Sequence, residues 1–350
     1  MAPFAGAAGI ILLATGSICL GAFLGSKKPE PIDDDSDESF NLTWWQVSIM
    51  PVSSSIFLLL LFYYFAYIQL ILIIFIVVGS GVSCLDVLRN SIAAFTPSLS
   101  GTVSSVLSTI FTICVIVIWA ANGSFIAHDI LGCSLCISSI AVIRFPSLKL
   151  AAVCLGLLLL YDIFWVFCSE YFFQKNVMVE VAMKSASNPL QELGTTYHIP
   201  LFMSLRPKLE LPIKLLVQSS FDAVNSRVMM LGLGDIALPG FLVSFALRCD
   251  IFHINKTALP QYSPESLLLR DHESSKKFPT LGRPSSNLFE CSIIGYTLGL
   301  VLALYIGSVS GHAQPALIYL VPGVIIPITL RAWQKKMLLE VWNGPAKLND

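Results

Sequence analysis

Charged residues are scarce in this sequence of 350 residues. Only 12% are Asp, Glu, Lys or Arg, whereas 55% are apolar; soluble domains are typically ~25% charged. A soluble globule of this length has too little interior to bury so much apolar surface. The net charge of −1 also provides no field that would recruit nucleic acid. The composition therefore excludes a disordered protein, a secreted disulfide scaffold and a DNA-binding protein, and indicates that lipid surrounds much of the chain.

Several familiar chemical motifs are also missing. The sequence contains no His-Glu-x-x-His zinc motif and no Gly-x-Ser-Gly serine motif. The nine cysteines are odd in number, and seven lie well inside apolar segments, which favours buried free thiols over a disulfide framework. Cys133 and Cys136 have C-x-x-C spacing but no second pair. We therefore expect neither a metal nor a cofactor.

Nine apolar segments are each long enough to cross a bilayer as a helix, which takes ~20 residues. They are residues 4–25, 47–67, 69–88, 103–121, 125–143, 149–171, 229–247, 290–309 and 314–333. As one helix, the stretch 47–88 would be about 63 Å long, roughly twice the ~30 Å hydrocarbon core, so we divide it near Tyr67-Ile68-Gln69. The sequence predicts an all-α, polytopic membrane protein with nine transmembrane helices.

The basic residues favour one orientation in the membrane. With the N-terminus in the lumen, 15 of the 21 Lys and Arg residues fall in cytosolic segments, and the other six lie in the long luminal loop 172–228. The C-terminus is then cytosolic. We treat residues 1–350 as one membrane-embedded domain, whose cytosolic parts are an acidic linker (26–46), a loop (248–289) and a tail (334–350).

Two aspartates interrupt apolar segments at a similar depth. Asp162 lies nine residues before the end of segment 149–171, or ~13 Å along a helix, and Asp235 lies six residues after the start of segment 229–247, or ~9 Å. Loop 172–228 joins the two segments, so both distances are measured from the same membrane face. Carboxylates at bilayer depth are costly and usually functional. We therefore expect these two aspartates to share one site.

A pair of neighbouring carboxyl groups has a defined chemistry. Like charges at close range cannot both ionise, so one group keeps its proton while the other stays a carboxylate. The carboxylate can take a proton from a water that attacks a peptide carbonyl, and the acid can protonate the carbonyl oxygen. Gly232 and Gly234, just before Asp235, remove Cβ atoms where another backbone can approach. These residues predict aspartic-protease chemistry without a covalent intermediate.

Three short motifs together resemble one family. They are Tyr161-Asp162, Gly232-Leu233-Gly234-Asp235 and, at the start of the last segment, Pro315-Ala316-Leu317. With nine spans and a long loop between the aspartates, this pattern resembles the signal peptide peptidase and presenilin family of intramembrane aspartyl proteases, and its signal peptide peptidase branch in particular. The resemblance implies a presenilin-like fold with Asp162 and Asp235 as the catalytic pair. It also implies site-supporting or substrate-binding roles for Tyr161, Gly232, Leu233, Gly234, Pro315, Ala316 and Leu317.

Two further strings, Arg144-Phe145-Pro146-Ser147-Leu148-Lys149 and Asn176-Val177-Met178-Val179, resemble one subgroup of that branch. The resemblance implies a Golgi enzyme that cleaves single-span proteins with a cytosolic N-terminus, Golgi glycosyltransferases among them, and so releases their luminal parts. A location in the ER or plasma membrane stays open. The implied partners are single-span membrane proteins and the lipid bilayer, without nucleic acid, and self-association into a homo-oligomer also fits.

A proton-coupled transporter or channel is the alternative, because such proteins also use intramembrane carboxylates. It would give a role to Asp86 and to Asp129, which lies beside His128. Packing or helix-end roles explain these residues more simply. A transporter requires no Gly-x-Gly-Asp motif level with a Tyr-Asp motif, so we favour the protease. A catalytically silent scaffold would leave both Asp162 and Asp235 without a role.

Overall fold

The computed structural model describes residues 2–27, 40–95, 101–184, 186–198, 205–218, 228–258, 287–310 and 314–344. Within these ranges, eight helices are long and apolar enough to cross a membrane. Six of them are α1 (Ala2–Lys27), α3 (Gly101–Asn122), α4 (Phe125–Val142), α10 (Leu233–Ala258), α11 (Leu288–Ser310) and α12 (Leu317–Gln334). The predicted class, an all-α polytopic membrane protein, is confirmed. Most of the acidic linker and of the loop 248–289 lies outside the described residues.

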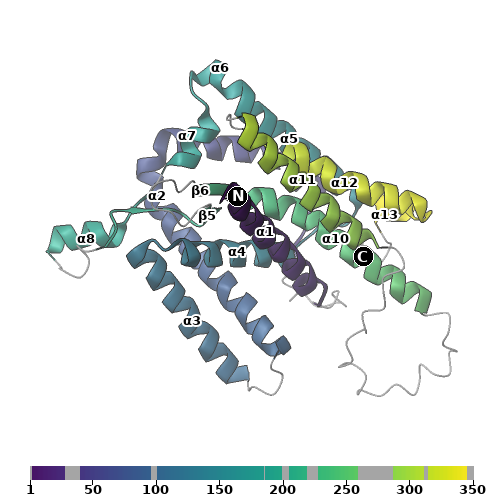
Figure 1. The fold of residues 1–350 in the computed structure, drawn as a ribbon, viewed down its shortest axis with the longest axis horizontal. Helices are drawn as coiled ribbons and strands as arrows, with labels where there is room; N and C mark the ends of the chain where they lie inside the picture. Colours follow the sequence, from purple (N-terminus) through teal and green to yellow (C-terminus); the bar gives the residue numbers. More distant parts are fainter. Residues whose placement is uncertain are drawn as a thin grey trace.

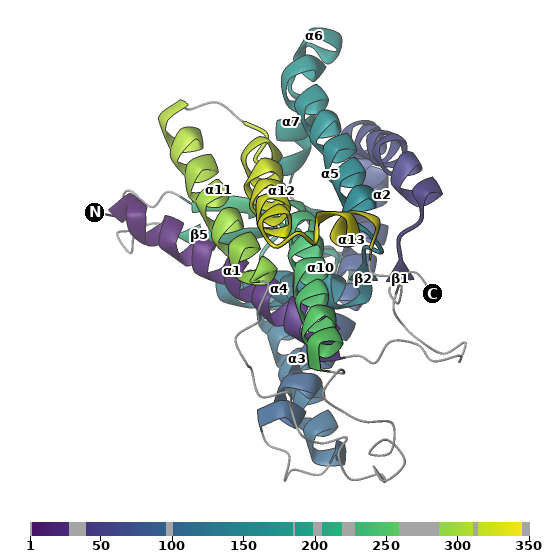
Figure 2. The same ribbon diagram turned by 90° about the vertical axis from the view of Figure 1, so that its right-hand side faces the viewer.

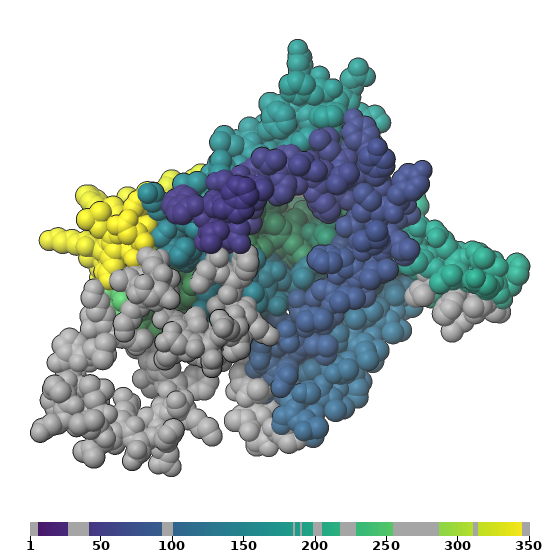
Figure 3. Space-filling model, turned by 180° about the vertical axis from the view of Figure 1, so that it is seen from behind, coloured from purple at the N-terminus to yellow at the C-terminus, as the bar shows by residue number. Residues whose placement is uncertain are grey.

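The helix α2 (Trp44–Phe95) contains both segments that the sequence predicts as separate spans, 47–67 and 69–88. Its backbone leaves helical geometry at Tyr64, where φ is −115° and ψ is 19°. The helix therefore has a first arm (residues 44–63) and a second arm (residues 65–95) that point in different directions (Figures 1 and 3). The break lies slightly earlier in the chain than the one expected from length alone. Nine spans stays a prediction, because it requires each arm to cross the membrane separately.

Asp162 belongs to a long helix with an internal π-helical turn. The helix is composed of α5 (Leu148–Ile163), the π-helix η1 (Phe164–Cys168) and α6 (Ser169–Phe173). Together they form one apolar stretch of 26 residues, close to the predicted segment 149–171. Single π-helical turns inside α-helices frequently mark functional sites, and this one begins two residues after Asp162.

The prediction that a helix begins at residue 229 is wrong. Val228–Gly232 instead form strand β6, which pairs antiparallel with β5 (Lys214–Gln218), and α10 begins only at Leu233. Pairing with β5 satisfies backbone groups that a helix would otherwise have to satisfy internally, and glycine is a poor helix former. Asp235 therefore lies in the first turn of α10.

The remaining short elements lie at the ends of the long helices. They are the pairs β1 (Phe40–Asn41) with β2 (Ile143–Arg144) and β3 (Ala186–Ser187) with β4 (Lys208–Leu209), and the helices α7 (Val177–Met183), α8 (Pro189–Tyr197) and α13 (Leu338–Asn343). α8 projects away from the helix bundle in Figure 1. The β1–β2 pair joins the start of α2 to the end of α4.

α10 is the central helix of the bundle. It packs against α1, α4, α5, α11 and α12, and it is the most deeply buried of the eight apolar helices. Figure 2 shows α12 between α11 and α5, above α10. This arrangement places the start of α12 beside the two helices that carry Asp162 and Asp235.

Candidate active site

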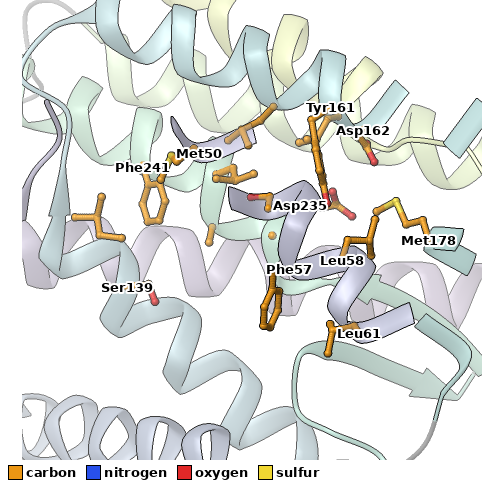
Figure 4. A pocket seen from close by; sticks show the side chains of 17 residues that line it. Met50, Phe57, Leu58, Leu61, Ser139, Tyr161, Asp162, Met178, Asp235 and Phe241 are labelled. Carbon is orange, nitrogen blue, oxygen red and sulfur yellow. The ribbon is translucent and has the colours of Figure 1, made fainter. Parts of the chain in front are cut away.

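Asp162 and Asp235 line one cavity of about 480 Å³. Asp162 comes from the last turn of α5 and is 3% exposed, whereas Asp235 comes from the first turn of α10 and is half-buried. The two carboxyl groups are close enough to interact electrostatically. Figure 4 shows Asp162 beside Tyr161 at the top of the cavity, with Asp235 nearer its centre. Because two like charges in such a setting cannot both ionise, the geometry suits a shared proton.

The start of the last long helix reaches the same cavity. Leu317 lines it, and the backbone N–H of Leu317 lies near the Asp162 carboxyl group. The turn before α12 is braced by the Tyr319 hydroxyl, which donates a hydrogen bond of 2.9 Å to the side-chain oxygen of Gln314. A backbone donor at this position can stabilise negative charge on the carboxylate.

Five of the nine predicted site residues line the cavity: Tyr161, Asp162, Gly234, Asp235 and Leu317. The other four are their neighbours in the chain: Gly232, Leu233, Pro315 and Ala316. A Cβ atom on Gly232 would lie 3.3 Å from Oδ2 of Asp235, so glycine leaves room for the carboxylate. A Cβ atom on Gly234 would meet nothing within 4 Å. The backbone at Gly234 is therefore open to the approach of another chain.

The opposite wall of the cavity is a part of the site that sequence reasoning missed. It comes from the first arm of α2, through Met50, Ser54, Phe57, Leu58 and Leu61. Figure 4 shows Phe57 and Leu61 across the cavity from Asp162. From behind, green atoms, the colour of α10, are visible in the recess below this arm (Figure 3). These five positions recur with helical spacing, but in a uniformly apolar segment that pattern does not distinguish a protein-facing side from a lipid-facing one.

Two supporting contacts were also missed. Tyr296 of α11 is fully buried, and its hydroxyl donates a hydrogen bond of 3.5 Å to the carbonyl oxygen of Asp235. Trp165, in η1, donates from Nε1 to Oγ of Ser55 at 3.1 Å, which ties the helix of Asp162 to the first arm of α2. Both contacts join helices that are distant in the chain, so no local pattern indicates them.

The other intramembrane carboxylates lie outside the cavity lining. Asp129 accepts a hydrogen bond of 2.9 Å from the N–H of Leu216 in β5, and its Oδ1 lies 3.2 Å from Nδ1 of His128. Asp86 is exposed on the second arm of α2. Among the described residues, no three His, Cys, Asp or Glu side chains gather where they could hold a metal. The packing role that the sequence suggests for Asp129 agrees with its bond to β5.

Comparison with known proteins identifies the class of protein to which this site belongs. A sequence profile of the signal peptide peptidase family matches residues 34–347. Signal peptide peptidase-like 1 of Arabidopsis thaliana is 36% identical over 240 residues, which are 67% of this chain and 60% of that protein. Signal peptide peptidase-like 1 of Oryza sativa subsp. japonica is 34% identical over 330 residues, or 89% and 84% of the two chains. Signal peptide peptidase-like 3 of Arabidopsis thaliana is 32% identical over 253 residues, or 70% and 38%.

The chain therefore belongs to the signal peptide peptidase family of intramembrane aspartic proteases, and it is a multi-pass membrane protein. The family assignment agrees with the pair of aspartates that line one cavity and with the resemblance that the three sequence motifs carry. The match covers about three fifths of the Arabidopsis like-1 protein and most of the rice like-1 protein.

Proposed function

We propose that this chain hydrolyses peptide bonds within or near the transmembrane segment of single-span membrane proteins, with Asp162 and Asp235 as its catalytic pair. The observation that carries this proposal is the single cavity that both carboxyl groups line, one from α5 and one from α10. The rest of that lining is mostly apolar, as a site for an apolar substrate segment requires.

One of the paired carboxyl groups acts as the base and the other as the acid. The ionised group removes a proton from a water as the water oxygen attacks the scissile carbonyl carbon, while the protonated group gives its proton to the carbonyl oxygen. The tetrahedral intermediate then breaks its C–N bond: one carboxyl group gives its proton to the leaving nitrogen, while the other takes a proton from a hydroxyl of the intermediate as the C=O bond re-forms. The new carboxyl terminus and the new amine are released, and the pair returns to a single shared proton.

Cleavage requires a substrate backbone that is no longer helical, because a helix keeps its carbonyls hydrogen-bonded. Strand β6 provides an edge along which such an extended substrate backbone could pair. It pairs with β5 along one edge and ends at Gly232, just before Asp235, and no other described strand pairs with it. An extended substrate segment along its other edge would exchange helical hydrogen bonds for strand hydrogen bonds. The exposed backbone of Gly234 then leaves space for a carbonyl group beside Asp235.

Separate Asp162→Asn and Asp235→Asn variants test the catalytic pair. Each replaces a carboxyl group by an amide of similar size that can act neither as the base nor as the acid. We expect each variant to abolish cleavage of a single-span reporter in membranes while the protein accumulates normally. Asp86→Asn, which alters an exposed carboxylate on α2, is the matched control and should cleave like the wild type. Residual cleavage by either of the first two variants would refute the catalytic pair.

The substrate class and location are finer proposals. The strings at 144–149 and 176–179 resemble the signal peptide peptidase-like protein 3 group, which favours Golgi membranes and substrates with a cytosolic N-terminus, including Golgi glycosyltransferases whose luminal parts would be released. Two reporters with the same transmembrane segment in opposite orientations test this. We expect cleavage of the reporter with the cytosolic N-terminus to be much faster, and equal cleavage of both would argue against an orientation-specific enzyme.

A further inference from the structure

The break in α2 coincides with a lysine from a distant part of the chain. Lys184 directly follows α7, and its Nζ lies 2.7 Å from the carbonyl oxygen of Phe62 and 3.3 Å from that of Leu61. A break at Tyr64 disturbs the hydrogen bonds that carbonyls one turn earlier would otherwise accept. Neither Gly nor Pro lies near the break, and a side chain that bonds into the helical ladder is a known cause of such kinks. Lys184 therefore donates to two carbonyls at the end of the first arm, directly before the break.

Two aromatic rings surround the same ammonium group. Nζ of Lys184 lies 5.4 Å from the ring centroid of Phe62 and 5.5 Å from that of Phe65. Phe62 belongs to the first arm of α2 and Phe65 to the second, so one charge contacts both sides of the break through cation–π interactions. The charge also lies at the C-terminal end of the first arm, where the helix dipole is negative. Three kinds of contact thus favour a positive charge at this point.

The position of the first arm matters because this arm forms a wall of the cavity. Leu61, whose carbonyl Lys184 binds, lines the cavity, and so does Met178 of the helix α7 that precedes Lys184. Phe62 packs against Phe173, with ring centroids 6.2 Å apart, and Phe173 ends the helix that carries Asp162. The break, the wall of the cavity and the helix of Asp162 are therefore in direct contact.

We propose that Lys184 is a positioning residue: it fixes the break in α2 and so holds the first arm at the separation from Asp162 and Asp235 at which the cavity accepts a substrate segment. The effect of Lys184 on cleavage rests on the proposed protease function, whereas its effect on the position of the first arm does not. Because Lys184 bonds to Leu61 in the wall opposite the carboxyl groups and not to the carboxyl groups themselves, its loss acts on substrate binding more than on the chemical step.

Cleavage kinetics of a single-span reporter test the first consequence. Lys184→Met keeps an apolar stem but removes the charge and the donors, and we expect it to lower kcat/KM about tenfold, mainly through KM. Lys184→Arg restores the charge and the N–H donors and should recover most of that loss. Lys208→Met, which alters an exposed lysine on β4, is the matched control and should behave like the wild type. Wild-type kcat and KM in Lys184→Met would overturn the proposal.

A crosslinking experiment tests the position of the first arm of α2 and needs no cleavage assay. Sδ of Met50, on the first arm, lies 3.8 Å from Sγ of Cys154 on α5. In a Met50→Cys background, a short bis-methanethiosulfonate reagent should link the introduced thiol to Cys154. We expect Lys184→Met to reduce the yield of this crosslink, and Lys184→Arg and Lys208→Met to leave it unchanged. An equal yield in all variants would overturn the positioning role. If the wild type cleaves no reporter, the proposed function fails, while the crosslink still decides the role of Lys184.

Discussion

At the scale of single residues, the costly intramembrane aspartates have different surroundings. Asp162 and Asp235 face a cavity, whereas Asp129 has its carboxylate oxygen bonded to the N–H of Leu216. A buried charge is tolerated when hydrogen bonds satisfy it. Because β5 pairs with β6, and β6 leads directly into the turn of Asp235, the bond from Asp129 fixes the strand pair that precedes a proposed catalytic residue.

Loss of the Asp129 carboxylate should loosen that strand pair. Asp129→Ala leaves the Leu216 N–H without its acceptor, and an unsatisfied buried donor costs about 1–3 kcal/mol. We expect faster hydrogen exchange across residues 214–218 and slower reporter cleavage. Asp129→Asn retains a side-chain oxygen and should show a smaller change in both measurements. Unchanged exchange at Leu216 in Asp129→Ala would show that the carboxylate does not hold β5.

At the scale of helices and strands, the sequence predicts the features that depend on the composition of neighbouring residues. Apolar runs locate the long helices, although α10 continues to Ala258, eleven residues beyond the predicted end at 247. The motifs bring Asp162, Asp235 and Leu317 to one cavity. The sequence does not predict features that depend on a contact with a distant part of the chain. Strand β6 forms because β5 lies beside it, and the break at Tyr64 is accompanied by bonds from Lys184. A window of neighbouring residues contains neither partner, so the predicted helix start at 229 was wrong.

The packing of α11 on α12 also depends on which glycines of α11 face α12. Gly299 of α11 lies so close to α12 that a Cβ atom there would be 2.8 Å from the carbonyl oxygen of Tyr319, whereas a Cβ atom on Gly307 of the same helix would meet nothing within 4 Å. Small residues permit this approach of helix backbones in membranes. The contact is two residues from Leu317, so it helps to fix the start of α12 beside Asp162.

An alanine at each of these glycines gives a matched pair of variants. Gly299→Ala forces the two backbones apart, and overpacking of this kind costs about 1–3 kcal/mol; we expect a lower Tm in detergent and slower cleavage, because Leu317 moves with α12. Gly307→Ala should leave Tm unchanged or raise it slightly, since alanine suits a helix better than glycine. Equal Tm values for the two variants would mean that α11 and α12 are not held at this distance.

At the scale of the whole molecule, one end of the bundle collects basic residues and joins several helix ends. Arg144 donates from Nη2 to the carbonyl oxygen of Gly25 at 3.3 Å, and Arg248 donates from Nη2 to that of Phe145 at 3.4 Å. These bonds join the end of α1 to β2, which directly follows α4, and the second half of α10 to the residue after β2. Basic residues concentrate on the cytosolic side of membrane proteins, so this end supports the proposed orientation with a luminal N-terminus.

The same end bears on the number of spans. The β1–β2 pair places residues 40–41 beside residues 143–144, so the chain must cross the membrane an even number of times between them. We expect α3 and α4 to cross once each, which leaves two crossings for the arms of α2 and agrees with the predicted nine spans. An odd number of spans puts the two termini on opposite sides.

We therefore expect a glycosylation acceptor fused to the N-terminus to be modified and one fused to the C-terminus to stay unmodified, with a C-terminal epitope open to protease from the cytosol. If both termini lie on one side, α2 crosses the membrane only once and the nine-span topology is wrong.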